Sequence, residues 1–184
     1  YIYMNNVIYL HGANASPENF NYFTLKLPEH PFFAPAYDME DDPFDIVEIL
    51  RIRKEREFGK KPVVVVGHSF GGLIASWYAS VYPRRVKHLV TIATPWEGTP
   101  VARIFGYFWR NAKVFQNTRP GADVLSLLQE KNFTGKHTNI VSKKFGSWLF
   151  LSEIFIPIDL DEDKHFFSRR LLTIYKSFSV LISS

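Results

Sequence analysis

Gly67, Ser69 and Gly71 occupy alternate positions in the stretch GHSFGG, directly after the four valines of 63–66. A serine hydroxyl is a poor nucleophile until the backbone presents it openly and a nearby base takes its proton. Small residues two positions to either side allow the sharp, strained strand-to-helix turn that such a serine requires. We therefore expect Ser69 to lie at a tight corner and to attack an acyl carbon.

The pattern around this corner predicts alternating strands and helices. The β-branched run 63–66 is typical of a strand buried on both faces, and residues 73–82 have a helical pattern that Pro83 ends. Similar patterns predict strands at 7–10, 32–37, 86–94, 137–142 and 154–160, and helices at about 43–58, 122–131 and 166–181. This alternation predicts an α/β fold with a predominantly parallel sheet covered by helices on both faces. Ligands of such sheets bind beyond the carboxyl ends of the strands, where Ser69 lies.

Length and composition favour one globular domain. The 184 residues are 46% hydrophobic and 22% charged, and an aromatic-rich segment at about 100–136 suits a cap-like insertion. The apolar run 145–158 contains Glu153 and is shorter than the roughly 20 residues that span a bilayer, so we expect a soluble protein.

The charge and the residue types narrow the range of partners. The net charge is +4, with short basic clusters scattered along the chain and no accompanying nucleic-acid motif. We therefore expect no nucleic-acid partner, while the mild basicity suits peripheral contact with a lipid interface. The absence of cysteine excludes disulfides and thiolate metal sites. No metal-ligand spacing is present, and we expect neither a metal nor a cofactor.

His11, Gly12 and Ala13 follow the first expected strand, and here the sequence resembles the α/β-hydrolase fold. Three further stretches resemble segments of its small lipase- and esterase-like serine hydrolases: TPWEGTPVA at 94–102, RPGADVL at 119–125 and DKHFF at 163–167. The resemblance implies that the backbone N–H groups of Ala13 and Phe70 form an oxyanion hole. It also implies a structural role for His11.

His165 is the expected base. It follows the last expected strand and precedes the last expected helix, which agrees with the chain order serine, acid, histidine of this fold. Other histidines suit the role less well. His137 would begin a strand at the opposite end of the sheet, His68 points away in the family pattern, and His30 and His88 accompany no motif.

The carboxylate that orients the base is left open. The resembled family places it after the strand 137–142, but residues 143–147 contain no Asp or Glu. Asp159, at the end of the last expected strand, is the first alternative, and Glu97, after the strand 86–94, is the second. Glu153 is disfavoured because a parallel crossover needs about a dozen residues, and the next strand begins directly after it.

These features predict a serine ester hydrolase that cleaves a small-molecule or lipid ester through an acyl-serine intermediate. The aromatic residues of the expected cap would line an apolar acyl pocket. Acyltransferase, thioesterase or amidase chemistry on the same machinery is one alternative, because a fold does not choose among these. The other is a binding module with a decayed site, which the missing acid after Ser142 suggests. The sequence leaves oligomeric state and compartment open.

Overall fold

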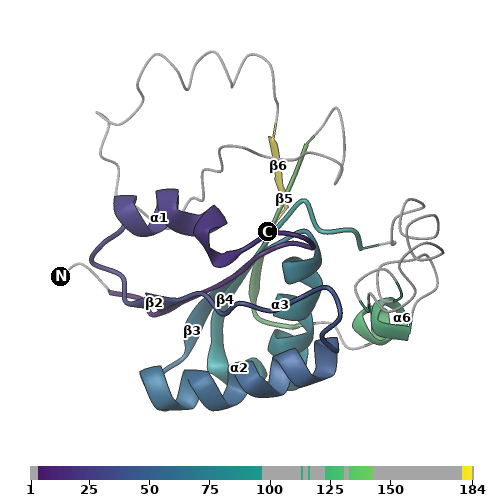
Figure 1. Ribbon diagram of the computed structural model, residues 1–184, viewed down its shortest axis with the longest axis horizontal. Helices are drawn as coiled ribbons and strands as arrows, with labels where there is room; N and C mark the ends of the chain where they lie inside the picture. Colours follow the sequence, from purple (N-terminus) through teal and green to yellow (C-terminus); the bar gives the residue numbers. More distant parts are fainter. Residues whose placement is uncertain are drawn as a thin grey trace.

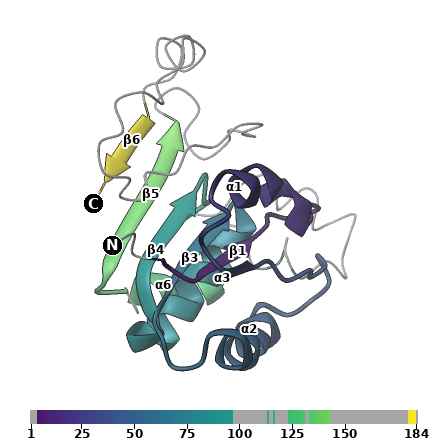
Figure 2. The ribbon, with the colours of Figure 1, turned by 90° about the vertical axis from the view of Figure 1, so that its left-hand side faces the viewer.

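The computed structural model describes residues 4–96, 113, 116, 123–130, 133–142 and 180–183. Its centre is a six-stranded sheet with the order β2-β1-β3-β4-β5-β6. The strands are β1 (Val7–Leu10), β2 (Phe32–Phe33), β3 (Val63–His68), β4 (Val86–Ile92), β5 (Lys136–Ser142) and β6 (Val180–Ser183). The first five run parallel, and β6 pairs antiparallel with β5 (Figures 1 and 2). The predicted predominantly parallel α/β sheet is confirmed.

Helices cover both faces of this sheet (Figure 1). The helical elements are η1 (Pro17–Phe20), α1 (Asn21–Lys26), α2 (Pro43–Phe58), α3 (Phe70–Val81), η2 (Pro83–Arg85) and α6 (Asp123–Glu130). Alternate residues of β1 belong to different cores: Ile8 and Leu10 pack with α2, α3 and α6, whereas Val7 and Tyr9 pack with η1 and α1. Because successive strand side chains point to opposite faces, one short apolar strand supplies both cores.

Helix α2 begins and ends at the residues that its sequence predicts. The Asp42 carboxylate accepts the backbone N–H of Phe44 at 2.9 Å, Pro43 occupies the first turn, and Gly59 ends the helix at φ 59°. A proline has no N–H to leave unpaired in the first turn, and glycine adopts positive φ without a Cβ clash. The helix thereby packs an apolar face of Ile46, Val47 and Leu50 against the sheet.

Two sequence predictions are corrected. The strand expected at 32–37 pairs only at Phe32–Phe33, and Pro35, which lacks an N–H, follows as unpaired chain. The helix expected at 166–181 is wrong at its end, because Val180 and Leu181 belong to β6. Three consecutive apolar residues, Val180 to Ile182, suit a strand as well as a helix, and pairing with β5 decides between them. Residues 166–179 and the strand expected at 154–160 lie outside the described residues.

Helix α6 joins the main body of the protein. Its Leu125 and Leu128 are buried in the same core as α3, and it lies between β4 and β5 in the chain. It therefore serves as a crossover helix of the parallel sheet. Most of the segment expected to form a cap lies outside the described residues, so the cap stays a prediction. Among the helices described, none is long and apolar enough to cross a membrane.

Candidate active site

Ser69 occupies a strained corner between β3 and α3. Its backbone has φ 53° and ψ −120°, in the positive-φ half of the Ramachandran map that residues with a Cβ rarely adopt. Two hydrogen bonds hold the corner: the Ser69 N–H donates to the Ile92 carbonyl at 2.8 Å, and the Gly72 N–H donates to the Ser69 carbonyl at 2.9 Å. The sharp turn expected from the sequence is therefore present, and β4 and α3 hold it in place.

Three positions around Ser69 require glycine, because other backbone or side-chain atoms approach too closely to leave room for a Cβ. A Cβ at Gly67 would overlap the first turn of α3 at Gly71. A Cβ at Gly71 would overlap the end of β1, 2.6 Å from the Leu10 carbonyl carbon. One at Gly72 would overlap Thr94, 2.9 Å from its Cβ. Helix α3 therefore starts in direct contact with both neighbouring strands, β1 and β4, because no side chain separates them.

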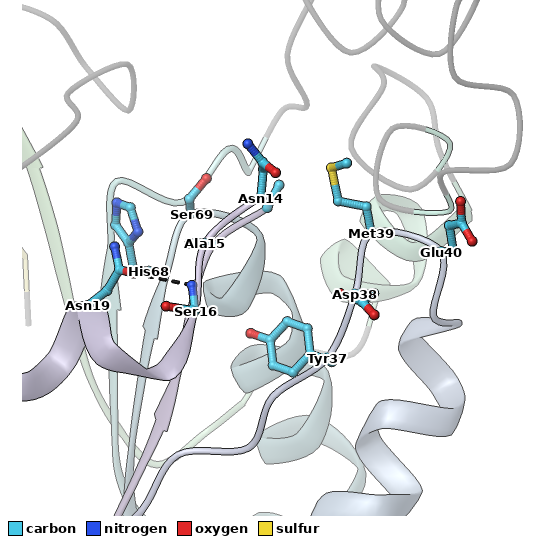
Figure 3. A pocket seen from close by; sticks show the side chains of 12 residues that line it. Asn14, Ala15, Ser16, Asn19, Tyr37, Asp38, Met39, Glu40, His68 and Ser69 are labelled. Carbon is cyan, nitrogen blue, oxygen red and sulfur yellow. Dashed lines mark hydrogen bonds between the residues drawn. The ribbon is translucent and has the colours of Figure 1, made fainter.

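A cavity of about 740 Å³ opens beside Ser69 (Figure 3). Strand β1 lies between β2 and β3 in the sheet. After β1 the chain continues to β2 on one side, and after β3 it continues to β4 on the other side, so the strand order reverses between β1 and β3. Ligands of parallel sheets bind where the strand order reverses in this way. The loops after β1 and β3 meet there: a Cβ at Gly12 would lie 3.2 Å from both the Ser69 Cβ and the His68 Nδ1.

The described wall of this cavity combines polar and apolar surface, and its charged side chains are acidic. The loop after β1 contributes Asn14 and Ser16, and the Ser16 N–H donates to the Asn19 side chain at 3.2 Å. The segment after β2 contributes Asp38 and Glu40, which form no ion pair with any described residue. Figure 3 shows these two segments facing each other, with Ser69 at the rim.

His68 departs from the sequence-based expectation. It was expected to point away from the site, but it lines the same cavity as Ser69 (Figure 3). Burial lowers its pKa, so the ring is neutral at neutral pH. The difference arises because His68 is the last residue of β3 and lies beside the Gly12 backbone. Among the described residues, no side chain hydrogen-bonds the Ser69 hydroxyl.

The remaining expected site residues divide into two groups. Ala13 lines the cavity, and Phe70 is the first residue of α3, so its N–H has no acceptor within the helix. The expected base His165 and both alternatives for the acid, Asp159 and Glu97, lie outside the described residues. The structure thus brings Ala13 and Phe70 near Ser69, while the roles of all five residues stay predictions.

Two other histidines, His11 and His137, contact neighbouring side chains and are not among the residues that line the cavity. His137 is the second residue of β5, and its Nε2 lies 2.8 Å from the Thr91 Oγ1. His11 is buried, and its ring stacks on Tyr37 with centroids 4.0 Å apart. Sequence reasoning missed Tyr37 as a site residue because it was assigned to the end of a strand. The two flanking prolines, Pro31 and Pro35, were the available signal that the strand would stop early.

A metal site finds no support in the part of the chain that is described. Those residues contain no group of three or more His, Asp or Glu side chains arranged to hold an ion. The described wall of the cavity offers the Ser69 hydroxyl, backbone N–H groups and the positive end of a helix dipole, together with the neutral imidazole of His68 and the carboxylates of Asp38 and Glu40.

Comparison with known proteins decides the family. The model of the α/β hydrolase fold family matches residues 34–144, which include the Ser69 corner and the strands on either side of it. The chain belongs to the α/β hydrolase fold family. The resemblance to the α/β-hydrolase fold is thereby confirmed, with the Ser69 stretch inside the matched residues and the His11–Ala13 stretch before them.

Two curated relatives of this α/β hydrolase are an acetyltransferase and a lipase. The homoserine O-acetyltransferase of Thermus thermophilus is 33% identical over 84 residues, covering 45% of this chain and 22% of its own. A human (lyso)-N-acylphosphatidylethanolamine lipase is 35% identical over 63 residues, covering 34% of this chain and 18% of its own. The chain thus spans about a fifth of the length of these relatives.

Solved structures share the fold of this α/β hydrolase. Phospholipase PlaB from Legionella pneumophila superposes with a TM-score of 0.57 at 18% identity, covering 68% of this chain and 33% of that one. The Bacillus licheniformis lipase BlEst2 superposes with a TM-score of 0.54 at 19% identity, covering 76% and 66%. At these identities the likeness concerns the architecture alone.

Proposed function

We propose that this α/β hydrolase is a serine esterase of the lipase or carboxylesterase kind, with Ser69 as its nucleophile. The observation that carries the proposal is the backbone of Ser69, held at φ 53° on the rim of a cavity of about 740 Å³. Such strain costs of order 1–3 kcal/mol and persists where the surroundings enforce it, often at functional sites. Three close-packed glycines enforce it here.

In the proposed reaction, the Ser69 oxygen attacks the acyl carbon of the ester while His165 takes its proton. The carbonyl oxygen becomes an oxyanion that accepts the N–H groups of Ala13 and Phe70. The intermediate then expels the alcohol, which receives the proton from His165, and leaves the acyl group on Ser69. Water repeats the sequence and releases the acid. Asp159 or Glu97 would orient His165.

The substrate class follows from the two sides of the proposed site. The wall that the structure describes carries Asn14, Asp38 and Glu40 beside apolar side chains, and these polar groups suit the alcohol part of an ester. The aromatic residues at 104–115 would supply the apolar surface for the acyl part, as the sequence predicts. We therefore propose a small-molecule or lipid ester with an apolar acyl group, met at a lipid interface if the substrate is a lipid.

Acyl transfer to an alcohol is the second candidate. The sequence match to a homoserine O-acetyltransferase favours it, because that enzyme and an esterase would differ only in what receives the acyl group. Competition between water and an added alcohol for the acyl-serine separates the two. A serine esterase releases mostly free acid, and a transferase releases mostly the new ester.

The deciding experiment is covalent labelling of the folded protein with a fluorophosphonate, followed by mass spectrometry. We expect labelling of Ser69 in the wild type, none in Ser69→Ala, and unchanged labelling in Ser80→Ala, a partly exposed serine of the same helix. Hydrolysis of p-nitrophenyl butyrate and octanoate by His165→Ala, Asp159→Asn and Glu97→Gln then tests the base and the acid. A folded wild type without label or turnover would instead support the decayed binding module.

A further inference from the structure

Two hydrogen bonds hold the turn that follows β1. The Tyr37 hydroxyl, from the segment after β2, donates to the His11 carbonyl. The His11 Nδ1–H donates to the Gly12 carbonyl at 2.9 Å. The two rings stack with centroids 4.0 Å apart and planes 12° from parallel. Tyr37 and His11, which are 26 positions apart in the chain, thus hold two consecutive peptide groups by hydrogen bonds.

These bonds determine where the next N–H groups point. In a trans peptide the carbonyl of one residue and the N–H of the next lie in one plane and point in opposite directions. The Tyr37 bond therefore fixes the Gly12 N–H, and the His11 bond fixes the Ala13 N–H. Ala13 lines the cavity beside Ser69. The preceding residue, Gly12, is also close, because a Cβ placed on it would lie 3.2 Å from the Ser69 Cβ. The direction of the Ala13 N–H is thus set by side chains that do not include Ser69.

The burial of His11 also points to a role beyond packing. The ring is 2% exposed, and its Nε2 has no hydrogen-bond partner among the described residues. A carbonyl can only accept, so the proton lies on Nδ1 and Nε2 keeps an unpaired lone pair. Leaving a buried acceptor unpaired is unfavourable, and a leucine would fill the space without that cost. What the imidazole provides and a leucine could not is the hydrogen bond from its Nδ1–H to the Gly12 carbonyl.

We propose that Tyr37 and His11 are positioning residues that aim the Ala13 N–H at the oxyanion formed during attack by Ser69. This inference rests on the proposed function. The bond that they orient is made to the charged intermediate and not to the ground-state ester. Loss of the Tyr37 hydroxyl should therefore slow the chemical step and leave substrate binding almost unchanged.

The test compares Tyr37→Phe with Tyr82→Phe. The first keeps the ring that stacks on His11, and the second removes a hydroxyl that donates to Glu48 at 3.1 Å, after the end of α3. The measurements are kcat and KM for p-nitrophenyl butyrate, Ki for a trifluoromethyl ketone that forms a tetrahedral adduct with serine, and the melting temperature.

For Tyr37→Phe we expect kcat to fall about 10- to 100-fold, with KM within about two-fold of wild type. The Ki of the ketone should rise by the same factor by which kcat/KM falls, because both report on the oxyanion. Tyr82→Phe should leave all three constants at their wild-type values.

A second pair of variants tests the His11 bond and does not depend on the folding of Tyr37→Phe. The amide nitrogen of asparagine lies close to the place of the histidine Nδ1, so His11→Asn can still donate to the Gly12 carbonyl. His11→Leu cannot. We expect His11→Leu to lose kcat and ketone affinity as Tyr37→Phe does, and His11→Asn to recover most of both.

The outcomes separate this inference from the proposed function. If the wild type is active but Tyr37→Phe or His11→Leu lowers only the melting temperature, the positioning role is refuted and the esterase stands. If the wild type neither labels at Ser69 nor hydrolyses any ester, the proposed function is refuted and the positioning role falls with it.

Discussion

Replacing Gly71 by alanine tests whether the corner at Ser69 depends on backbone contact between α3 and β1. The added Cβ would overlap the carbonyl oxygens of Leu10 and His11 and lie 2.6 Å from the Leu10 carbonyl carbon. Real Cβ atoms stay at least 3.0 Å from such atoms, so helix and strand must separate by at least about 0.4 Å at this point. Neither partner is a flexible side chain that could turn away.

The size of the effect follows from that forced separation. Inserting a methyl group into a closely packed region typically costs about 1–3 kcal/mol, and here the obstacle is backbone. For a chain of this length, each kcal/mol lowers the melting temperature by about 2–4 °C. The shift also moves the loop after β1 away from Ser69, and a misplacement of that kind can slow a reaction by up to about 100-fold. We expect both losses in Gly71→Ala.

The assay pairs thermal unfolding with the rate of fluorophosphonate labelling at Ser69. Gly59→Ala is the matched control, because Gly59 has φ 59° and nothing within 4 Å of a built Cβ. Alanine at this position is strained by about 1–2 kcal/mol, but Gly59 precedes the start of β3, whereas the corner follows its end. The control variant should lose stability and keep the wild-type labelling rate. A Gly71→Ala protein with wild-type stability and labelling would refute the argument from close approach.

Three further expectations concern stability. Ser69→Gly should abolish labelling yet raise the melting temperature by about 2–4 °C, since glycine relieves about 1 kcal/mol of strain at φ 53°. Burial lowers the pKa values of His68 and His137 below 6.5, so the unfolded chain binds protons more tightly than the folded one. Stability should therefore fall as the pH drops below about 6.5, and a urea midpoint measured at pH 7.5 and pH 5.5 should fall less in His137→Gln. Asp42→Ala removes the cap of α2 and should cost about 1 kcal/mol by urea unfolding, whereas exposed Asp45→Ala should cost almost nothing.

Much of the fold could be predicted from local sequence signals. The valine run, the Asp42–Pro43 start and the Gly59 stop each act over a few residues, and the structure has the corresponding strand and helix there. The strand expected at 32–37 was too long, although Pro31 and Pro35 signalled that it would be short. The end of the helix expected at 166–181 could not be predicted, because apolar residues suit either state and pairing with β5 decided the outcome.

The candidate site, too, could be predicted only where it depends on neighbouring residues in the chain. The spacing of Gly67, Ser69 and Gly71 predicted a sharp corner because the need for small neighbours is local. The sequence could not predict that Tyr37 stacks on His11 and hydrogen-bonds its carbonyl, or that His68 lines the cavity. Both contacts join segments from different strands, and no spacing along the chain encodes the distance between them.

The sequence by itself therefore determined a predominantly parallel α/β sheet with a sharp serine corner after one of its strands, because steric limits on turns and the alternation of strands and helices are properties of short segments. Only the tertiary structure decided which residues surround that serine. The order of the strands in the sheet brings the ends of β1 and β3 together, and with them the wall of the cavity and the two side chains that hold the turn after β1.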